Sequence, residues 1–119
     1  MVDQLRGKSA IVGVGHAGFG EAPGFSAYDI MAQSALAALD DAGLKLSDVD
    51  GLFCTMMEDA MPVLMAAEYL GIQPRYVDGT MTGGSSFVNY LTSATLALQA
   101  GLCDVALICY GSNQRTASG

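Results

Sequence analysis

A short run of glycines and serines carries the residue types best suited to chemistry in this chain. Gly83 and Gly84 allow a tight turn, and Ser85 or Ser86 can cap the helix expected after them. A turn of small residues before a helix exposes backbone N–H groups that can meet an anion or polarise a carbonyl oxygen. The same pattern is also typical of a purely structural strand-to-helix turn, so both interpretations stay open.

Two other side chains are candidates for catalysis. His16, the only histidine, has the chemistry of a general base, and Cys54 stands at the end of an expected strand, where ligand crevices form in parallel sheets. No partner pattern accompanies either one, so an incidental loop histidine and a buried, packed cysteine are the favoured interpretations. With Cys103 and Cys109, the three cysteines lack metal-ligand spacing and indicate reduced thiols.

The segment Gly13-Val14-Gly15-His16-Ala17-Gly18 matches a dinucleotide-binding fingerprint. A dinucleotide site needs a helix that begins at these glycines, but residues 19–24 contain glycines and a proline and predict a loop. The second expected strand ends in Cys54-Thr55, which supplies no acid for a ribose hydroxyl. These two departures argue against dinucleotide binding.

The elements that must position these residues alternate as β-α-β-α-β-α-β, which predicts an α/β fold with a mainly parallel sheet and right-handed crossovers. We expect strands at residues 9–14, within 49–54, at 75–78 and at 105–109. The first helix is expected over 27–42, with Ser26 and Asp29 as a capping box and Gly43 as its stop. The second is expected to be capped by Asp59, with Pro62 in its first turn.

The last expected helix, over residues 85–100, is apolar on almost every side. It contains no charged residue, and Leu91, Leu96 and Leu98 alternate with small residues, as in helices that are buried all round. The uncharged span 79–103 is long enough to cross a bilayer. Its many glycine, hydroxyl and amide residues favour a core helix over a transmembrane one.

Composition narrows the class of protein. The 119 residues amount to one domain, and 51% apolar with 14% charged residues excludes a disordered chain. The net charge of −7 argues against a nucleic-acid partner and against an anionic membrane surface. No apolar signal segment precedes Gly7-Lys8-Ser9, so we expect a cytoplasmic protein.

In their order and spacing, several segments together resemble the first half of the N-terminal domain of the thiolase superfamily, and most closely its sterol-carrier-protein and lipid-transfer-protein branch. The matching segments are residues 10–15, 42–44, 50–53, 69–72, 83–86 and 100–107. The resemblance implies that residues 1–119 are an incomplete thiolase-like N-terminal domain, a layered α/β structure with a buried central helix. It also implies the sheet order third, second, first, fourth strand, with the last helix against 9–14 and 105–109. The rest of this helix's cover would come from the second half of the fold and from a dimer mate.

Thiolases place a nucleophilic cysteine at the start of that helix, in a Cys-x-Ser-Gly setting. Counting back from Gly101, the cysteine position falls on Gly84, the motif's serine on Ser86, and its glycine on Phe87. Glycine has no side chain, so no acyl-cysteine can form there. Ser85 or Ser86 stays open as a substitute nucleophile, although the sequence shows no base to activate it.

The Gly-Gly-Ser variant is similar to thiolase-like aldolases of the lipid-transfer type. The resemblance implies carbon–carbon cleavage or formation in acyl-CoA thioesters, with coenzyme A as part of the substrate, no covalent cofactor and no metal site. It further implies a carbonyl group near Gly83 and Gly84, a homodimer, and an OB-fold partner with a zinc ribbon. Most catalytic groups would lie outside this chain. An acetyl-CoA acyltransferase and a non-catalytic acyl-CoA-binding subunit are the alternatives.

Overall fold

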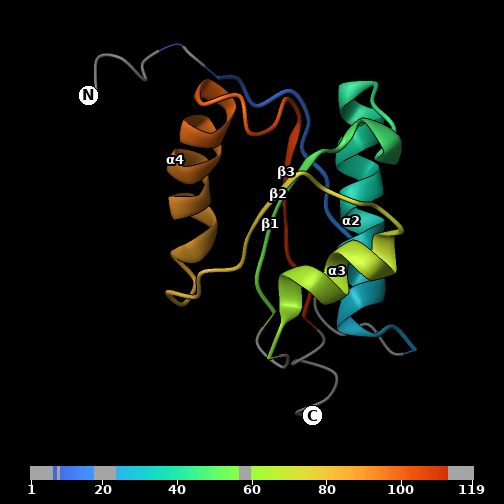
Figure 1. Cartoon of the computed structure of the whole chain (residues 1–119). Coiled ribbons are helices and arrows are strands. Elements are labelled where there is room, and N and C mark those ends of the chain that lie inside the picture. The colour runs from blue at the N-terminus through green and yellow to red at the C-terminus, as the bar shows by residue number, and fades with distance from the viewer. Residues whose placement is uncertain (1–6, 8, 18–23, 57–59, 113–119) are drawn as a thin grey trace.

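A parallel sheet lies between helices on both of its faces (Figure 1). The computed structural model describes residues 7, 9–17, 24–56 and 60–112. The strands are β1 Gly51–Cys54, β2 Tyr76–Asp78 and β3 Ala106–Cys109; the helices are α2 Ala27–Ala42, α3 Pro62–Leu70 and α4 Ser86–Gln99, with the short 3₁₀ turn η1 Leu46–Asp48 after α2. Helices α2 and α3 cover one face, and α4 covers the other. The expected layered α/β fold with a parallel sheet is therefore confirmed.

The strand order is β2-β1-β3, with every pair parallel. In the central strand, Gly51 lies opposite Tyr76 on one side and Ala106 on the other. The observed elements begin or end within a residue or two of the expected ones, which is the usual uncertainty at element ends.

The expected first strand is wrong. Residues 9–14 form no strand, and β1 pairs directly with β3, where the expected order put residues 9–14 between them. The Ser9 hydroxyl lies 2.8 Å from the Thr95 hydroxyl of α4, and the end of the segment lies against α2: a β-carbon on Gly13 would come within 2.3 Å of the Ala38 carbonyl oxygen. The Val14 N–H donates to the Asp41 carboxylate at 2.9 Å. The segment's main chain thus packs along a helix and joins no strand in the described structure.

The ends of α2 and α3 show which of the expected capping residues are present. The Asp29 N–H donates to the Ser26 hydroxyl and the Ser26 N–H to the Asp29 carboxylate, so the expected capping box is present, and Gly43 ends α2 with φ of 72°. Helix α3 begins at Pro62 with Met61 at the cap position, which makes no side-chain capping bond. The expected cap, Asp59, lies outside the described residues.

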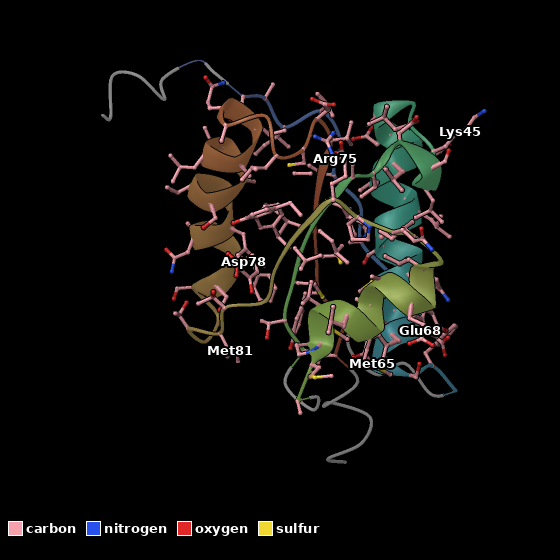
Figure 2. The ribbon with its side chains drawn as sticks, in the orientation of Figure 1. Lys45, Met65, Glu68, Arg75, Asp78 and Met81 are labelled. Atoms are coloured by element: carbon pink, nitrogen blue, oxygen red, sulfur yellow. The ribbon has the colours of Figure 1, made fainter. Side chains whose placement is uncertain are left out.

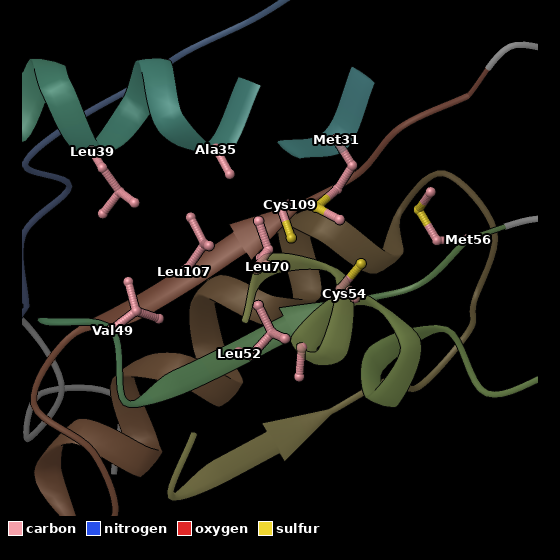
Figure 3. Packing of buried hydrophobic residues seen from close by; sticks show 12 residues of the cluster. Met31, Ala35, Leu39, Val49, Leu52, Cys54, Met56, Leu70, Leu107 and Cys109 are labelled. Atoms are coloured by element: carbon pink, nitrogen blue, oxygen red, sulfur yellow. The ribbon is translucent and has the colours of Figure 1, made fainter. Parts of the chain in front are cut away.

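Two hydrophobic clusters hold the layers together. The larger lies between the sheet and α2 and α3 (Figure 3); its buried residues are Met31, Ala35, Leu39, Val49, Leu52, Cys54, Met56, Ala66, Ala67, Leu70, Leu107 and Cys109. The smaller lies under α4 and comprises Phe53, Tyr90, Ala94, Ala97 and Cys103. Cys54 is fully buried beside Cys109 on the next strand, and their hydrogen bond, together with burial, raises the pKa of the Cys109 thiol. Cys54 is therefore a core residue.

Helix α4 is covered on one side only by the described chain. Its inner side chains pack on β1 and β3, while Val88, Leu91 and Leu96 are exposed by 67%, 42% and 43%. One-sided cover by this chain is what the resemblance implies, and the cover of the other side of the helix stays a prediction. None of the described helices combines the length and apolar character needed to cross a membrane.

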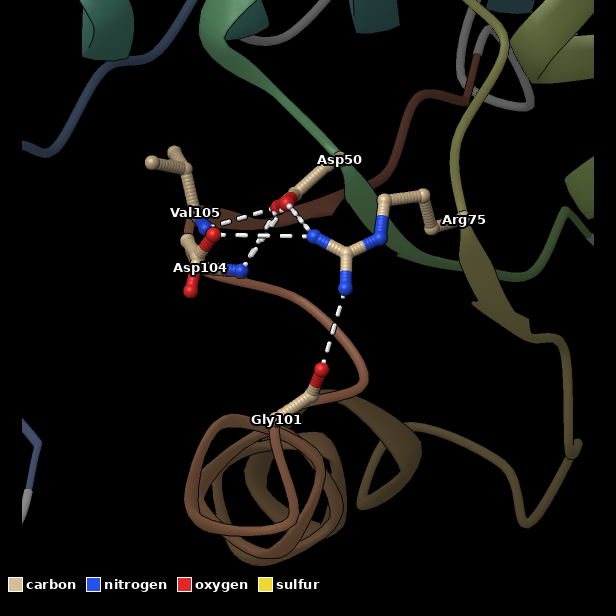
Figure 4. A network of polar contacts seen from close by, with 5 residues as sticks. All are labelled: Asp50, Arg75, Gly101, Asp104 and Val105. Carbon is tan, nitrogen blue, oxygen red and sulfur yellow. Dashed lines mark hydrogen bonds and ion pairs between the residues drawn. The ribbon is translucent and has the colours of Figure 1, made fainter.

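A polar network joins three connections at the amino end of the sheet (Figure 4). The Asp50 carboxylate accepts hydrogen bonds from the Asp104 and Val105 N–H groups and from Arg75, which also donates to the Gly101 carbonyl just after α4. Partial burial raises the Asp50 pKa, but these donors and the Arg75 charge outweigh it, so the pKa is lowered from 3.8. This network anchors the far end of α4.

Candidate functional site

The candidate site is the turn of residues 80–86, which connects the carboxyl end of β2 to the start of α4. Figure 2 shows Asp78 and Met81 beside the first turn of α4. The Asp78 carboxylate accepts hydrogen bonds from the N–H and the hydroxyl of Thr80, at 2.9 and 2.7 Å, and so orders the chain as it leaves β2. Ligands in parallel α/β sheets bind at this carboxyl edge.

The two glycines of the turn have different roles. Gly83 has φ of 75°, a left-handed conformation that strains other residues, whereas Gly84 does not have a positive φ. A β-carbon built on Gly84 meets no heavy atom within 4 Å. The backbone conformation of the turn therefore depends on Gly83, while Gly84 borders open space where the thiolase-like pattern would have a cysteine side chain.

Both serines hydrogen-bond inside the turn. The Ser85 hydroxyl donates to the Thr82 carbonyl at 2.9 Å, and the Ser86 hydroxyl accepts from the Thr82 N–H at 2.7 Å. Ser85 occupies the N-cap position but makes no side-chain capping bond, so the expected capping role is wrong for both serines. In the described part of the chain, no histidine or carboxylate contacts either hydroxyl, and neither serine has a base there to activate it.

The start of α4 presents backbone donors. The Ser86 N–H bonds to the Gly83 carbonyl at 3.1 Å and the Asn89 N–H to the Ser85 carbonyl at 3.0 Å. The N–H groups of Phe87 and Val88 have no acceptor within the described ranges, as is usual for a first helical turn. Together with the positive end of the helix dipole, these donors favour an electron-rich oxygen near the turn.

Three side chains that the sequence interpretation did not single out also meet at this edge. The buried Tyr90 hydroxyl donates to the Thr80 carbonyl at 2.6 Å, and burial followed by the nearby Asp78 charge raises the Tyr90 pKa to about 12. Thr55 follows β1 and donates to the Met81 sulfur, and the Tyr110 ring lies 4.9 Å from that of Phe87. Thr55 and Tyr110 each come directly after a strand, and that position was the signal available in the sequence.

His16 and the glycine fingerprint lie elsewhere. Their segment runs along α2, where a β-carbon on Gly15 would come 2.3 Å from the Ala38 nitrogen, whereas the turn opens beside α4 on the other face. Helix α2 begins only at Ala27, so no helix starts at Gly13 or Gly15, and Gly18 lies outside the described residues. Within the described ranges, no group of three or more His, Cys, Asp or Glu residues is arranged to hold a metal ion.

No family model matches this chain. It is 32% identical over 114 residues to a steroid side-chain-cleaving aldolase of Thermomonospora curvata. It is 33% identical over 113 residues to a 17-hydroxy-3-oxo-4-pregnene-20-carboxyl-CoA lyase of Mycobacterium tuberculosis. Each match covers 94% of this chain but only 29% of the relative, so the chain spans less than a third of these proteins' length.

Solved structures agree with the sequence matches. The structure named Ltp2-ChsH2(DUF35) aldolase superposes with a TM-score of 0.83 and 31% identity, over 94% of this chain and 29% of that one. An SCP2-thiolase-like protein from Mycobacterium smegmatis superposes with a TM-score of 0.64 and 27% identity, over 82% of this chain and 22% of that one. Xanthomonas campestris OleA, which is 22% identical, superposes with a TM-score of 0.70 over 81% of this chain and 31% of that one. The chain therefore has a thiolase-like fold.

Proposed function

We propose that this chain is part of a thiolase-like aldolase that cleaves or forms a carbon–carbon bond in acyl-CoA thioesters. The observation that carries the proposal is Gly84, which has no side chain and borders open space; the resemblance aligns this residue with the thiolase cysteine. Both curated relatives are named for an aldolase or a lyase, and one name specifies a CoA thioester. The substrate class is therefore a thioester with an oxygen function on a nearby carbon.

The chemistry requires little from the turn except binding and charge stabilisation. In a retro-aldol cleavage, a base removes the proton of a hydroxyl on the β-carbon, the bond between the α- and β-carbons breaks, and its electron pair passes to the thioester as an enolate. The α-carbon is then protonated, which gives a ketone or aldehyde and a shorter acyl-CoA. Backbone donors at the start of α4 suit the developing enolate oxygen. The base would come from outside this chain.

Other features of the proposal follow the relatives. The structure that pairs Ltp2 with ChsH2(DUF35) supports a partner protein. We propose an OB-fold partner with a zinc ribbon, a homodimer, and a cytoplasmic location. The non-catalytic acyl-CoA-binding subunit stays as the second candidate, because the described part of the turn contains no base. A cysteine-type acyltransferase is disfavoured, because Gly84 has no side chain and neither serine hydroxyl contacts a base among the described residues.

Two adjacent substitutions test this proposal in the complete protein, together with any partner that it needs. Gly84→Ala adds a methyl group that no protein atom opposes, so we expect steep loss of thioester cleavage with little change in thermal stability. Gly83→Ala is the matched control: it strains a left-handed residue and costs about 1–2 kcal/mol of stability. The substrate is 17-hydroxy-3-oxo-4-pregnene-20-carboxyl-CoA, and both products are quantified by mass spectrometry.

Three results would contradict the proposal. Unchanged activity in Gly84→Ala would place the substrate elsewhere, and equal loss of activity and stability in that variant would make the turn structural only. A stable acyl adduct on Ser85, Ser86 or Cys54 after incubation with acyl-CoA, detected by peptide mass spectrometry, would favour an acyltransferase.

A further inference from the structure

The side chain of Met81 lies over two buried hydroxyl groups at the turn. Thr55 is 3% exposed and Ser86 1% exposed, and both point their hydroxyls at the Met81 sulfur, at 3.6 and 3.9 Å. They come from different parts of the fold: Thr55 directly follows β1, and Ser86 is the first residue of α4. A single thioether is thus the common acceptor of two donors at the carboxyl edge of the sheet.

Thr55 depends on this sulfur more than Ser86 does. The Ser86 hydroxyl also lies 3.2 Å from the Thr82 hydroxyl, which can take its proton. In the described part of the chain, the Thr55 hydroxyl has the Met81 sulfur as its one hydrogen-bond partner. A thioether is a weak acceptor, and a buried hydroxyl without a good acceptor is costly. The Thr55 hydroxyl would therefore make a stronger hydrogen bond if an oxygen acceptor replaced the Met81 sulfur.

Met81 is able to move aside. Its side chain is 46% exposed, unbranched and flexible, while the hydroxyls beneath it are held by β1 and α4. If the side chain rotates into solvent, it uncovers the two neutral hydroxyl groups of Thr55 and Ser86. The Asp78 carboxylate is two residues before Thr80 on the same connection, which disfavours an anionic occupant. Two neutral hydroxyl donors suit the oxygen of a carbonyl.

We propose that, without substrate, the Met81 sulfur occupies the position that a substrate carbonyl oxygen takes in the complex. When substrate binds, the thioester carbonyl displaces this sulfur and accepts a hydrogen bond from the Thr55 hydroxyl. This proposal deepens the proposed function, on which it rests for the identity of the thioester. It assigns Thr55 as a substrate-binding residue and Met81 as the side chain that closes the subsite when no substrate is bound. Opening the subsite exchanges a weak hydrogen bond for a stronger one.

The test uses the complete protein with its partner, with ¹³C in the methionine methyl groups and Met81→Leu to assign the Met81 signal. Two ligands differ only in the carbonyl oxygen: acetyl-CoA and its thioether analogue S-ethyl-CoA. We expect acetyl-CoA to shift the Met81 methyl resonance and S-ethyl-CoA to leave it unchanged. Thr55→Val should weaken acetyl-CoA binding about tenfold, the contribution of one neutral hydrogen bond, and leave S-ethyl-CoA binding unaltered.

Two variants separate binding from packing. Thr55→Ser keeps the hydroxyl and should restore acetyl-CoA affinity. Thr92→Val makes the same chemical change at an exposed position of α4 and should alter neither ligand's affinity. Met81→Leu keeps the bulk of the side chain but removes the acceptor, so acetyl-CoA should bind at least as tightly as to the wild type. Weaker binding there would mean that the sulfur itself contacts substrate, which overturns the displacement.

The outcomes distinguish this inference from the proposed function. Thioester cleavage with an unmoved Met81 methyl, or with full acetyl-CoA affinity in Thr55→Val, overturns the carbonyl subsite and leaves the aldolase function standing. No cleavage, combined with a Met81 response that depends on Thr55, supports the subsite and favours the non-catalytic acyl-CoA-binding alternative. Neither cleavage nor a Met81 response contradicts both.

Discussion

The two faces of the sheet differ in composition and in what they support. The face under α2 and α3 is a broad cluster of aliphatic and sulfur-containing side chains, almost without polar groups. The face under α4 is a smaller cluster, rich in aromatic residues, that continues into the polar turn at residues 80–86. Stability and the candidate site are therefore supported mainly by opposite faces of one sheet.

Adjacent residues of β1 show how this division arises. Side chains alternate along a strand, so Leu52 enters the larger cluster and Phe53 the smaller one. The ring centroid of Phe53 lies 6.0 Å from that of Tyr90, whose hydroxyl donates a hydrogen bond to the Thr80 carbonyl. The site is thus connected to the sheet through aromatic residues of the smaller cluster.

The largest expected effect comes from the aliphatic face. Leu52→Ala removes a fully buried side chain and should lower the free energy of unfolding by about 2–5 kcal/mol, while kcat/KM of the folded protein is unchanged. Leu36→Ala, the same change at a half-exposed position of α2, is the control and should stay within about 0.5 kcal/mol. Urea unfolding and steady-state kinetics measure both. A loss of activity in folded Leu52→Ala would break the division between the faces.

An intermediate effect is expected at the amino end of the sheet, far from the turn. Asp50→Ala leaves the Asp104 and Val105 N–H groups without their acceptor and should cost about 1.5–3 kcal/mol, again without loss of activity. The folded-state pKa of Asp50 is lowered, so its contribution is present above the unfolded value near 3.8 and is lost as pH falls through the folded pKa. Unfolding curves of wild type and Asp50→Asn should therefore converge on acidification. Curves that stay parallel would show that the Asp50 charge does not stabilise the fold.

A substitution in the aromatic cluster under α4 should change stability least, but it should also reduce activity. Tyr90→Phe removes the bond to the Thr80 carbonyl and should cost about 1 kcal/mol, with a reduced kcat because the turn is less well held.

The same variant has a pH signature. The unfolded chain releases the Tyr90 proton near pH 10.0 and the folded chain only near 12, so wild-type stability falls between these values as pH rises. Tyr90→Phe should lack this component of the alkaline decline, which thermal unfolding at increasing pH measures. Unchanged kcat would show that Tyr90 does not position the turn.

Much of the local structure was predictable because its signals are local. The Ser26–Asp29 capping box and the Gly43 stop marked α2 from residues a few positions apart. Apolar runs marked β1 and β3, and Gly83-Gly84 marked the turn. Residues 9–14 have an apolar run of the same kind, but their main chain lies along α2 and joins no strand. The side chains of Ile11, Val12 and Val14 are exposed in the described structure, so an apolar run does not by itself make a strand or a buried segment.

The sequence by itself determined the alternation of strands and helices, the helix stops, and the absence of a cysteine at Gly84, since these depend on residue type and short spacing. Only the tertiary structure decided that β1 pairs directly with β3, that Gly83 rather than Gly84 takes the left-handed conformation, and that the serines bond within the turn. It also brought the Thr55 hydroxyl to the Met81 sulfur across 26 positions. Such contacts depend on how the layers pack, because residues distant in the chain have no local pattern that records their proximity.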